Sequence, residues 1–506
     1  METSTISSAL RKKINVVQTR VDLTVQPQDD ENIAKVLGVD AKANIANCQI
    51  LNGEANYTAN VVFDVAYQTD SKEISNMQDK TSVTGKIDDN TLSNLMEPIY
   101  KIEIVDVSIE NASSSEVRVS ATLEITLEVI DTNEINKFVP VDNNVFVKSQ
   151  VCPVLTKCDS GQNTVTVDSD FEIKQNVAKL LCSSTDVCVK SLTAGTGYYT
   201  IEGEIYAKAY MCIKDGEDAS YKLFSETIPF KEEVDAENLQ KDCKMEASVC
   251  IKCDEVMFGL ETQENGSLIK ISVPLLVRYV ALKEQEMELP CDAYSLTHKL
   301  NLVTDTYFAS TIEHNTHKHH VEGSIEISEN MPRIAKVLMV MNGNLNITNA
   351  VNQNGSVLVE GVLTTTVVYK ADDDEESINS VQVELPFSLT FDEENIKADD
   401  ELYVFGNIID IVIKAKKGKE LEIDADLVFD VDNYNKKAEP FVKEVILTEE
   451  LAKNPYPLSI YLAPAGSTLW DISKHLNVQE DLIVAQNPNL EYPLASPESI
   501  IYFNQR

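Results

Sequence analysis

A six-residue motif occurs three times in this chain, and it restricts the fold more than any other feature. The copies are Asn32–Leu37, Asn176–Leu181 and Arg333–Leu338, which read NIAKVL, NVAKLL and RIAKVL. Their first residues are 144 and 157 positions apart. Solenoid units are about 20–50 residues long, whereas a period of about 150 is the size of a whole domain. We therefore expect a string of related domains rather than a solenoid.

Each copy of the motif is followed by two long runs in which every second residue is apolar or small. A period of two places these residues on one face of a β-strand, and that face is buried. The runs therefore predict six long strands. They comprise Tyr57, Ala59, Val61, Phe63, Val65 and Tyr67; Val117, Val119, Ala121, Leu123, Ile125, Leu127 and Val129; Tyr199, Ile201, Gly203, Ile205, Ala207, Ala209 and Met211; Ile269, Ile271, Val273, Leu275, Val277 and Tyr279; Val357, Val359, Gly361, Leu363, Thr365, Val367 and Tyr369; and Leu421, Ile423, Ala425, Leu427, Phe429 and Val431.

These runs also predict the fold class and the limits of the modules. Asn-Gly pairs such as Asn52–Gly53 precede several runs, and Asn-Gly is a strong hairpin signal because both residues accept positive φ. The chain is expected to be mostly β, with three tandem antiparallel β-sandwich-like modules. We place a tail at residues 1–13 and the modules at residues 14–143, 144–292 and 293–437.

The chain is strongly acidic. It has 82 Asp and Glu against 43 Lys and Arg, a formal net charge of −39. Affinity for nucleic acid depends on cationic groups that displace counterions, so we exclude nucleic acid and anionic membranes as partners. No apolar run approaches the roughly 20 residues of a membrane span, and Met1–Ile14 does not form a secretory signal. We expect an intracellular protein with reduced cysteines and no membrane insertion.

No enzyme motif is found in the sequence. The patterns G-x-x-x-x-G-K-[ST], G-x-S-x-G and H-E-x-x-H, which mark nucleotide-binding and hydrolytic sites, do not occur. We therefore predict no catalytic residue, no cofactor and no metal site.

Two clusters keep a metal-dependent alternative open. One cluster is a group of four histidines. Imidazole is a common metal ligand, so one interpretation is a metal site, and the other is a solvated strand face without a ligand. The other cluster has the C-x-x-C spacing of zinc and redox sites. Its interpretations are a zinc site completed by a further cysteine, or thiols that cross-link an assembly. The alternative is that these cysteines are small buried side chains without a ligand. The residues are His314, His317, His319 and His320, and Cys250, Cys253, Cys243 and Cys291.

The pattern changes after Lys437. A linker is predicted at residues 438–455, with a helical stretch over Glu444–Lys453 followed by a proline-containing segment. A small domain at residues 456–506 then reads as strand, helix, helix, strand. Thr468 is predicted to cap the first helix, Leu469–Leu476, together with Asp471 in a capping box. The second helix is predicted at Gln479–Gln486, and the last strand at Ile500–Phe503.

This small domain resembles the LysM family. The resemblance rests on Gly466-Ser467-Thr468-Leu469-Trp470 at the start of the first helix and on Asn487-Pro488-Asn489 after the second. LysM domains bind polymers of N-acetylglucosamine between these two loops. This chain departs from the family pattern in both loops, because Ser467 replaces an acidic residue and Pro497-Glu498-Ser499 replaces Gly-Gln. The resemblance therefore implies the βααβ fold, while the departures favour a different ligand.

The upstream modules resemble the SPOCS domain, which is also catalogued as a domain of unknown function in spore-forming bacteria. That domain joins a Lys-[VIL]-Leu start to an alternating strand that ends near a tyrosine, here Tyr67, Tyr210 and Tyr369. Tandem SPOCS modules with a terminal LysM domain are typical of SipL-type spore coat morphogenetic proteins. The resemblance implies a non-enzymatic scaffold in the mother-cell cytoplasm, at the forespore surface. Its implied partners are the SpoIVA-type morphogenetic ATPase and other coat proteins.

The predicted partner surface follows from the LysM resemblance and from the enrichment of tryptophan at interfaces. The alternative for Trp470, the only tryptophan of the chain, is packing in the core of the small domain. The alternative function is a peptidoglycan- or cortex-binding protein in which the β modules form a stalk. The predicted surface comprises Leu458, Ile460, Ser467, Thr468, Leu469, Trp470, Ile472, Lys474, Asn487 and Asn489.

Overall fold

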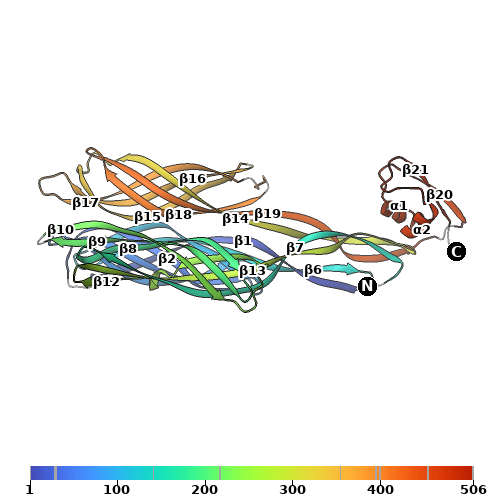
Figure 1. Cartoon of the computed structure of the whole chain (residues 1–506), viewed down its shortest axis with the longest axis horizontal. Helices are drawn as coiled ribbons and strands as arrows, with labels where there is room; N and C mark the ends of the chain where they lie inside the picture. Colours follow the sequence, from blue (N-terminus) through green and yellow to red (C-terminus); the bar gives the residue numbers. More distant parts are fainter. Residues whose placement is uncertain are drawn as a thin grey trace.

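The chain forms three two-sheet β-sandwiches that lie side by side, a stalk of long strands, and a small C-terminal unit at the far end (Figure 1). This is a computed structural model. It describes residues 2–27, 31–140, 142–215, 218–353, 355–393, 396–397, 400–452 and 455–503. In the described part, no helix is long and apolar enough to cross a membrane.

The first sandwich has two three-stranded antiparallel sheets, with strand orders β1-β6-β5 and β2-β3-β4. Buried side chains from both sheets meet in one core. Its strands are β1 (Glu2–Val25), β2 (Ile33–Leu51), β3 (Glu54–Thr69), β4 (Ile74–Asp88), β5 (Glu97–Ala112) and β6 (Val117–Val139).

The second sandwich pairs a sheet of order β10-β9-β8 with a sheet in which β13 lies beside β7, β11 and β12. The short 3-10 helix η1 (Cys253–Glu255) separates β11 from β12, which together take the place that the single strand β5 has in the first sandwich. Its strands are β7 (Val145–Ile173), β8 (Val177–Ala194), β9 (Tyr198–Asp215), β10 (Asp218–Asp235), β11 (Lys244–Ile251), β12 (Met257–Gln263) and β13 (Gly266–Ser295).

The third sandwich repeats the plan of the first, with sheet orders β14-β19-β18 and β15-β16-β17. Its core again takes side chains from both sheets. Its strands are β14 (His298–Glu326), β15 (Ile334–Asn352), β16 (Ser356–Ala371), β17 (Ile378–Asp392), β18 (Glu401–Ala415) and β19 (Glu420–Glu450).

The predicted mostly β fold is confirmed, and the six alternating runs are the central strands of the six sandwich sheets. They form the middle of β3, β6, β9, β13, β16 and β19, each with a neighbour on both sides. In β3, for example, Ala59, Val61, Phe63 and Val65 are fully buried. A central strand has no free edge and buries one whole face in its own sandwich, which explains why its alternation is so regular.

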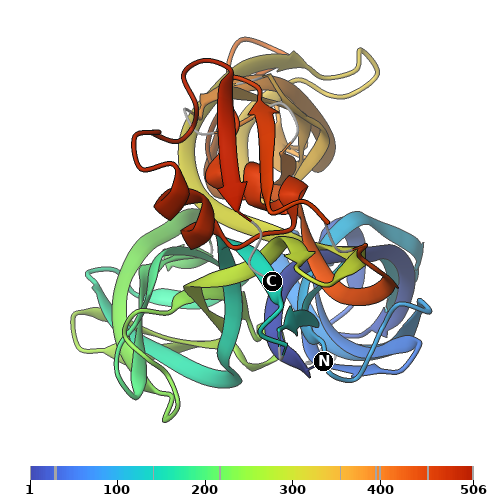
Figure 2. The same cartoon turned by 90° about the vertical axis from the view of Figure 1, so that its right-hand side faces the viewer.

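The expected string of separate domains is wrong, because the three sandwiches pack around a common axis (Figure 2). The repeated motif lies at this contact. Leu37 and Leu181, the last residues of the first two copies, are buried in one cluster with Met339, and Leu338 of the third copy packs against it. Tyr210 of β9 also accepts a hydrogen bond from the backbone N of Val340 (2.7 Å). The motif therefore joins the sandwiches to one another.

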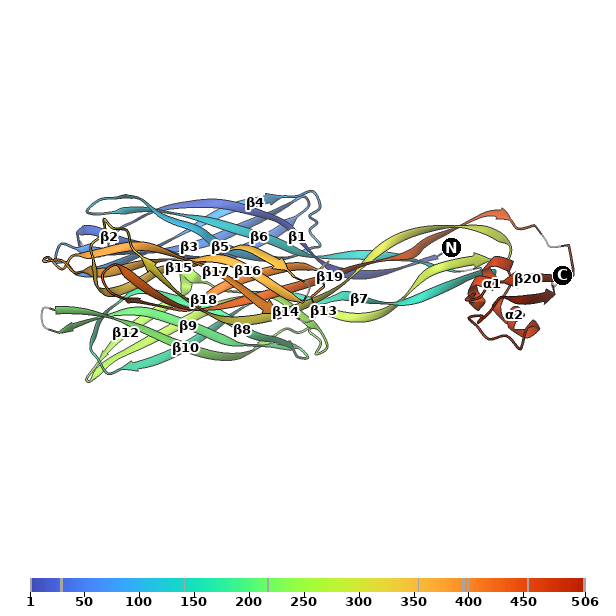
Figure 3. The ribbon, with the colours of Figure 1, turned by 90° about the horizontal axis from the view of Figure 1, so that it is seen from above.

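The stalk consists of the strand pairs β1/β6, β7/β13 and β14/β19, which run beyond the sandwiches (Figure 3). Side chains from all three pairs form small cores there, one of which contains Ile135, Leu289 and Phe441. Two sequence-based expectations fail in this region. Residues 2–13, expected as a tail, begin β1, and the expected helix at Glu444–Lys453 is the end of β19 as far as Glu450; Lys453 lies outside the described residues.

The predicted domain limits stay predictions, but the elements can be placed against them. The limit between residues 143 and 144 lies in the turn between β6 and β7. The limit between residues 292 and 293 lies near the end of β13, and the first part of the predicted linker 438–455 belongs to β19.

The C-terminal unit has the predicted order of strand, helix, helix, strand. Its elements are β20 (Leu458–Ala463), α1 (Leu469–Leu476), α2 (Glu480–Gln486) and β21 (Glu498–Phe503). Antiparallel pairing of β20 with β21 forms a two-stranded sheet. The helices cover one face of this sheet, where Ile472, Ile483, Ile500 and Tyr502 form the core.

Candidate interaction surfaces

Local signals in the sequence fix the start of α1. Gly466 has a positive φ of 83°, which allows the chain to turn out of β20. Thr468 accepts a hydrogen bond from the backbone N of Asp471 (3.2 Å), and the Asp471 carboxylate accepts one from the backbone N of Thr468 (3.0 Å). This is the predicted capping box, and it satisfies two of the backbone donors at the helix start.

The sheet of the C-terminal unit has an exposed apolar outer face. Strand alternation directs one set of side chains toward the helices and the other set outward. The register pairs Leu458 with Phe503 and Ile460 with Ile501, and Leu462 continues the same face. These side chains are 40–67% exposed, with Ile460 at 66% and Leu462 at 67%. We call these five residues the outer face. In Figure 3 the sheet lies beyond the helices, at the end of the molecule.

The structure divides the ten residues of the predicted partner surface into several groups. Leu458 and Ile460 belong to the outer face, and Asn489 is exposed in the loop after α2. Thr468 caps α1, Leu469 packs against the small core, and Ile472 is 1% exposed inside it. Ser467 donates a hydrogen bond to the Pro464 carbonyl (2.8 Å). Their role in binding stays a prediction.

Asn487 is a structural residue of the C-terminal unit. It is 8% exposed, its amide N donates to the carbonyls of Ile483 (2.9 Å) and Ile501 (2.7 Å), and its side-chain oxygen accepts from the backbone N of Ile501 (2.9 Å). Asn487 thus ties the end of α2 to β21. An asparagine is suited to this place because it offers both donors and an acceptor.

The remaining two predicted residues, Trp470 and Lys474, contact the stalk, although Lys474 is also partly exposed to solvent. Both donate hydrogen bonds from α1 to the carboxylate of Asp292, near the end of β13. The Trp470 ring also meets the edge of the Tyr294 ring, with centroids 5.0 Å apart. Asp292 and Tyr294 carried no signal in the sequence, because their partners lie almost 180 residues away.

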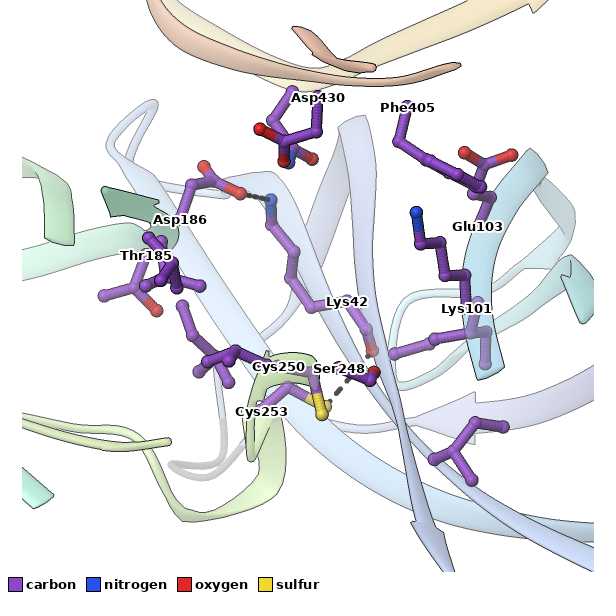
Figure 4. A pocket seen from close by; sticks show the side chains of 18 of the residues that line it. Lys42, Lys101, Glu103, Thr185, Asp186, Ser248, Cys250, Cys253, Phe405 and Asp430 are labelled. Atoms are coloured by element: carbon purple, nitrogen blue, oxygen red, sulfur yellow. Dashed lines mark hydrogen bonds and ion pairs between the residues drawn. The ribbon is translucent and has the colours of Figure 1, made fainter. Parts of the chain in front are cut away.

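A cavity of about 740 Å³ lies between the three sandwiches, lined by β2, β5, β8, β11, β15 and β18 (Figure 4). Most of the charged groups that face it have a partner of opposite charge. Lys42 of β2 pairs with Asp186 of β8 (Nζ–Oδ1 3.1 Å). The Cys253 thiol lies beside Asn44 Oδ1 (3.0 Å) and donates a hydrogen bond to it. These contacts cross from the first sandwich to the second, so they connect the modules.

Arg11 joins all three sandwiches at one end of this cavity. It lies on β1, is 6% exposed, and contacts carboxylates on three other strands. Its guanidinium nitrogens lie 2.5 Å from Glu128 of β6, 2.8 Å from Glu246 of β11 and 3.4 Å from Asp432 of β19. Burial raises the pKa of the Glu246 carboxyl to about 7, although the charge of Arg11 lowers it. We call these four residues the Arg11 cluster.

Two further basic residues contact the Asp432 carboxylate. His314 of β14 lies 2.7 Å from it (Nδ1–Oδ1), and Lys101 of β5 lies 3.7 Å from it. Although burial opposes ionisation, the hydrogen bond from His314 and the charges of Lys101 and Arg11 hold the pKa of Asp432 well below its usual range. The same hydrogen bond raises the pKa of His314.

The other predicted histidines do not converge on one point. The His317 ring stacks on Phe391 with centroids 4.8 Å apart and its Nε2 meets Glu393 (2.5 Å). His320 lies on the exposed side of the strand between Asp426 (2.7 Å) and Glu322 (3.1 Å). The His319 ring also lies against Phe391, with centroids 4.7 Å apart. His317 and His319 thus share one aromatic ring, whereas His314 and His320 contact separate carboxylates, so the four histidines do not form a common ligand set.

The cysteines are all free thiols in this structure. Cys250 lies near the end of β11 and Cys253 begins η1, so the C-x-x-C segment spans a strand end and a helical turn rather than one strand. Burial raises the pKa of both thiols to about 12. A thiol with a raised pKa is a weak nucleophile, which agrees with a packing role.

Comparison with known families adds one match. The model described as "SipL, SPOCS domain" matches residues 333–416, which begin with the third copy of the repeated motif and run through β15, β16, β17 and β18. Residues 333–416 are therefore similar to the SPOCS domain of SipL, and we call this segment the SPOCS domain. No curated protein and no solved structure matches the chain.

The SPOCS domain contributes to the contact between the sandwiches. Met339, Met341 and Val368 belong to it and lie with Leu37 and Leu181 in the buried cluster between the three sandwiches, which we call the axial cluster. The corresponding residues of the first and second sandwiches thus meet the SPOCS domain through the same part of the repeat. This supports a SipL-like, repeat-built β architecture.

The sequence-based prediction did not include three residues of the outer face, Leu462, Ile501 and Phe503, although the pattern of apolar residues in the two strands indicates them. In β21 both Ile500 and Ile501 are apolar, and in β20 Leu462 continues the row begun by Leu458 and Ile460. Two short helices can cover only one face of a two-stranded sheet. Apolar residues at both odd and even positions of these strands therefore indicate that the second face of the sheet is apolar and uncovered.

One prediction concerns a buried carboxyl next to the axial cluster. Asp64 of β3 is 6% exposed, and burial raises its pKa to about 7, while a hydrogen bond from Asn76 Nδ2 (3.0 Å) lowers it. A raised folded-state pKa means that the folded chain holds this proton more tightly than the unfolded chain. Its stability contribution is therefore present at low pH and lost as the pH rises through about 7.

We expect Asp64→Asn to make the chain more stable than the parent at pH 8 by about 1–3 kcal/mol and to flatten the fall in stability between pH 5 and pH 8. Urea unfolding at several pH values measures this. Asp305→Asn serves as the control, because Asp305 is an exposed stalk residue paired with Lys443. A parent-like pH profile for Asp64→Asn would show that Asp64 titrates normally.

Proposed function

We propose that this chain is a non-enzymatic scaffold of spore coat assembly whose C-terminal unit binds a SpoIVA-type morphogenetic ATPase. It acts in the mother-cell cytoplasm at the forespore surface, where it helps to localise the ATPase and other coat proteins. The observation that carries the proposal is the outer face. Five exposed apolar side chains on one small sheet are more than a monomeric unit of this size needs, and such patches mark sites of protein interaction.

Three further observations support a scaffold. The match of residues 333–416 to the SipL SPOCS domain supports a SipL-like role. The cavity between the sandwiches is lined by charged groups that pair across the modules, and these pairs hold the sandwiches together. The stalk separates the outer face from the sandwiches, so that a large partner meets no obstacle (Figure 1).

The alternative, binding of peptidoglycan, depends on the LysM resemblance. Carbohydrate recognition requires polar side chains free to bond to hydroxyl groups. Ser467, Thr468 and Asn487, which lie in the two loops that hold glycan in LysM domains, already bond within the unit. An apolar face is better suited to a protein surface.

The test uses the full chain and a purified SpoIVA-type ATPase. We expect Ile460→Asp, which places a charge in the centre of the outer face, to weaken binding by at least about tenfold, because truncating or charging a central hot spot costs about 2 kcal/mol or more. Calorimetry or a pull-down measures this. The matched control is Val484→Asp, an exposed apolar residue of α2 that lies off the outer face.

The same proteins are tested against purified peptidoglycan. Binding of the parent chain to the ATPase, lost in Ile460→Asp and kept in Val484→Asp, supports the proposal. Equal binding by both variants contradicts a role for the outer face. Binding to peptidoglycan without binding to the ATPase overturns the proposal in favour of the glycan alternative.

A further inference from the structure

The contact between α1 and β13 has the features of a specific attachment. Trp470 Nε1 donates to Asp292 Oδ2 (2.9 Å), and Lys474 Nζ donates to Asp292 Oδ1 (2.6 Å). The two donors are four residues apart and therefore lie on the same face of α1. One carboxylate thus accepts a hydrogen bond on each of its oxygens from a single helix face, which is a strong, geometrically defined contact.

Tyr294, two residues further along β13, provides the second part of the contact. Its hydroxyl donates to the carbonyl of Val478, just after α1 (2.9 Å), and its ring meets Trp470 edge-on. The ring is itself held by stacking on Phe146 of β7, with centroids 5.3 Å apart. Tyr294 is only 3% exposed. A buried tyrosine with both its ring and its hydroxyl engaged is a fixed element of the stalk rather than a mobile surface group.

The covalent connection alone does not define the position of the C-terminal unit. Residues 451–457 join the end of β19 to the start of β20, and the described residues of this segment belong to no helix or strand. Contacts between α1 and β13 therefore supply the second point of attachment that orients the unit. With two points fixed, the outer face is directed away from the stalk.

We infer that Asp292, Trp470 and Lys474 form an intramolecular latch that holds the C-terminal unit on the end of the stalk, at the strand pair β7/β13. In the latched chain the Trp470 face of α1 is occupied by the chain itself, while the outer face is open. Trp470 is then a positioning residue. A partner that binds the Trp470 face must first displace Asp292. This inference goes beyond the proposed function and requires no partner to be tested.

Charge supports the latch at neutral pH. Although partial burial opposes ionisation of Asp292, the hydrogen bonds from Lys474 and Trp470 hold its pKa below the usual range. The other charged groups near the contact are Glu480 of α2, which faces Tyr294, and Lys148 of β7, which faces Asp471. A carboxyl with a lowered pKa keeps its charge at neutral pH, so the latch stays closed there and opens only as the pH falls through that lowered value.

The experiment uses the intrinsic fluorescence of the full chain, because Trp470 is its only tryptophan. We expect Asp292→Asn, which keeps the shape of the side chain and removes its charge, to shift the emission to the red and to increase quenching by acrylamide. Lys474→Met should have the same effect. The double variant should show no larger change than either single variant, because both changes remove one shared contact.

Asp305→Asn is the matched control, since it removes an aspartate of the stalk that pairs with Lys443 and lies away from α1. Its emission should equal that of the parent chain. Urea unfolding followed by circular dichroism verifies that every variant folds. Unchanged emission and quenching in Asp292→Asn, in a folded chain, overturns the latch. Additive changes in the double variant also overturn it, because they would mean that Asp292 and Lys474 act separately.

Discussion

Replacing Arg11 by methionine should lower the free energy of unfolding of the full chain by about 3–5 kcal/mol, the usual cost of removing one partner from a buried ion cluster. The reason is the position of Arg11 between the three sandwiches. Glu128, Glu246 and Asp432 would remain buried with less positive charge beside them. Chemical unfolding followed by circular dichroism measures the change.

Arg20→Met is the control for this prediction. Arg20 lies on the same strand and also pairs with two carboxylates, Asp22 and Glu110, but its side chain is 56% exposed. Exposed ion pairs contribute about 0–1 kcal/mol because water screens them, so this variant should remain close to the parent chain. Equal losses in the two variants would mean that the Arg11 cluster is solvated and does not hold the sandwiches together.

Leu181→Ala should destabilise the chain by about 2–5 kcal/mol, the range observed when a buried leucine is truncated to alanine. Leu181 is fully buried, yet its neighbours in the axial cluster include side chains of the other two sandwiches. The cavity would therefore open between modules rather than inside one. We expect the unfolding transition to be broader than that of the parent chain, or to split, because the sandwiches lose part of the contact that couples them.

Leu223→Ala in the same sandwich is the matched control, since Leu223 is 39% exposed. Its loss should be below about 1 kcal/mol. A sharp, parent-like transition in Leu181→Ala would show that the contact at Leu181 is not what makes the sandwiches unfold together. That outcome would contradict the view that the repeated motif joins the modules.

The sequence predicts the interior of this protein well because its signals are local. The run from Tyr57 to Tyr67 alternates because this face of β3 lies in the core of the first sandwich, and the other five central strands face the cores of their own sandwiches in the same way. The start of α1 is equally local, since Thr468 and Asp471 cap the helix within a single turn. Strand period and capping can both be recognised without knowledge of the rest of the chain.

Contacts between modules could not be predicted in this way. Arg11 has partners 117, 235 and 421 residues away, so nothing near it in the sequence indicates that it is buried. The sequence predicts a tail at residues 1–13, whereas residues 2–13 begin β1 and pair with β6. Good helix formers suggested a helix after Glu444, but pairing with β14 outweighs their intrinsic preference.

The candidate site was predicted only in part, and the reason is again distance along the chain. The small domain and two residues of its outer face, Leu458 and Ile460, follow from local pattern. Trp470 and Lys474 were placed on a partner surface, whereas the structure sets them against Asp292. Only the folded chain shows which of two adjacent faces is already occupied.

The long strand pairs of the stalk have a mechanical consequence. The pairs β1/β6, β7/β13 and β14/β19 lie along the line that joins the sandwiches to the C-terminal unit (Figure 3). A force that pulls the two ends of the molecule apart would load these ladders lengthwise, so that many hydrogen bonds must break at once rather than one after another. A chain built in this way is expected to resist stretching when its two ends are attached to different partners, because the strands are loaded in shear.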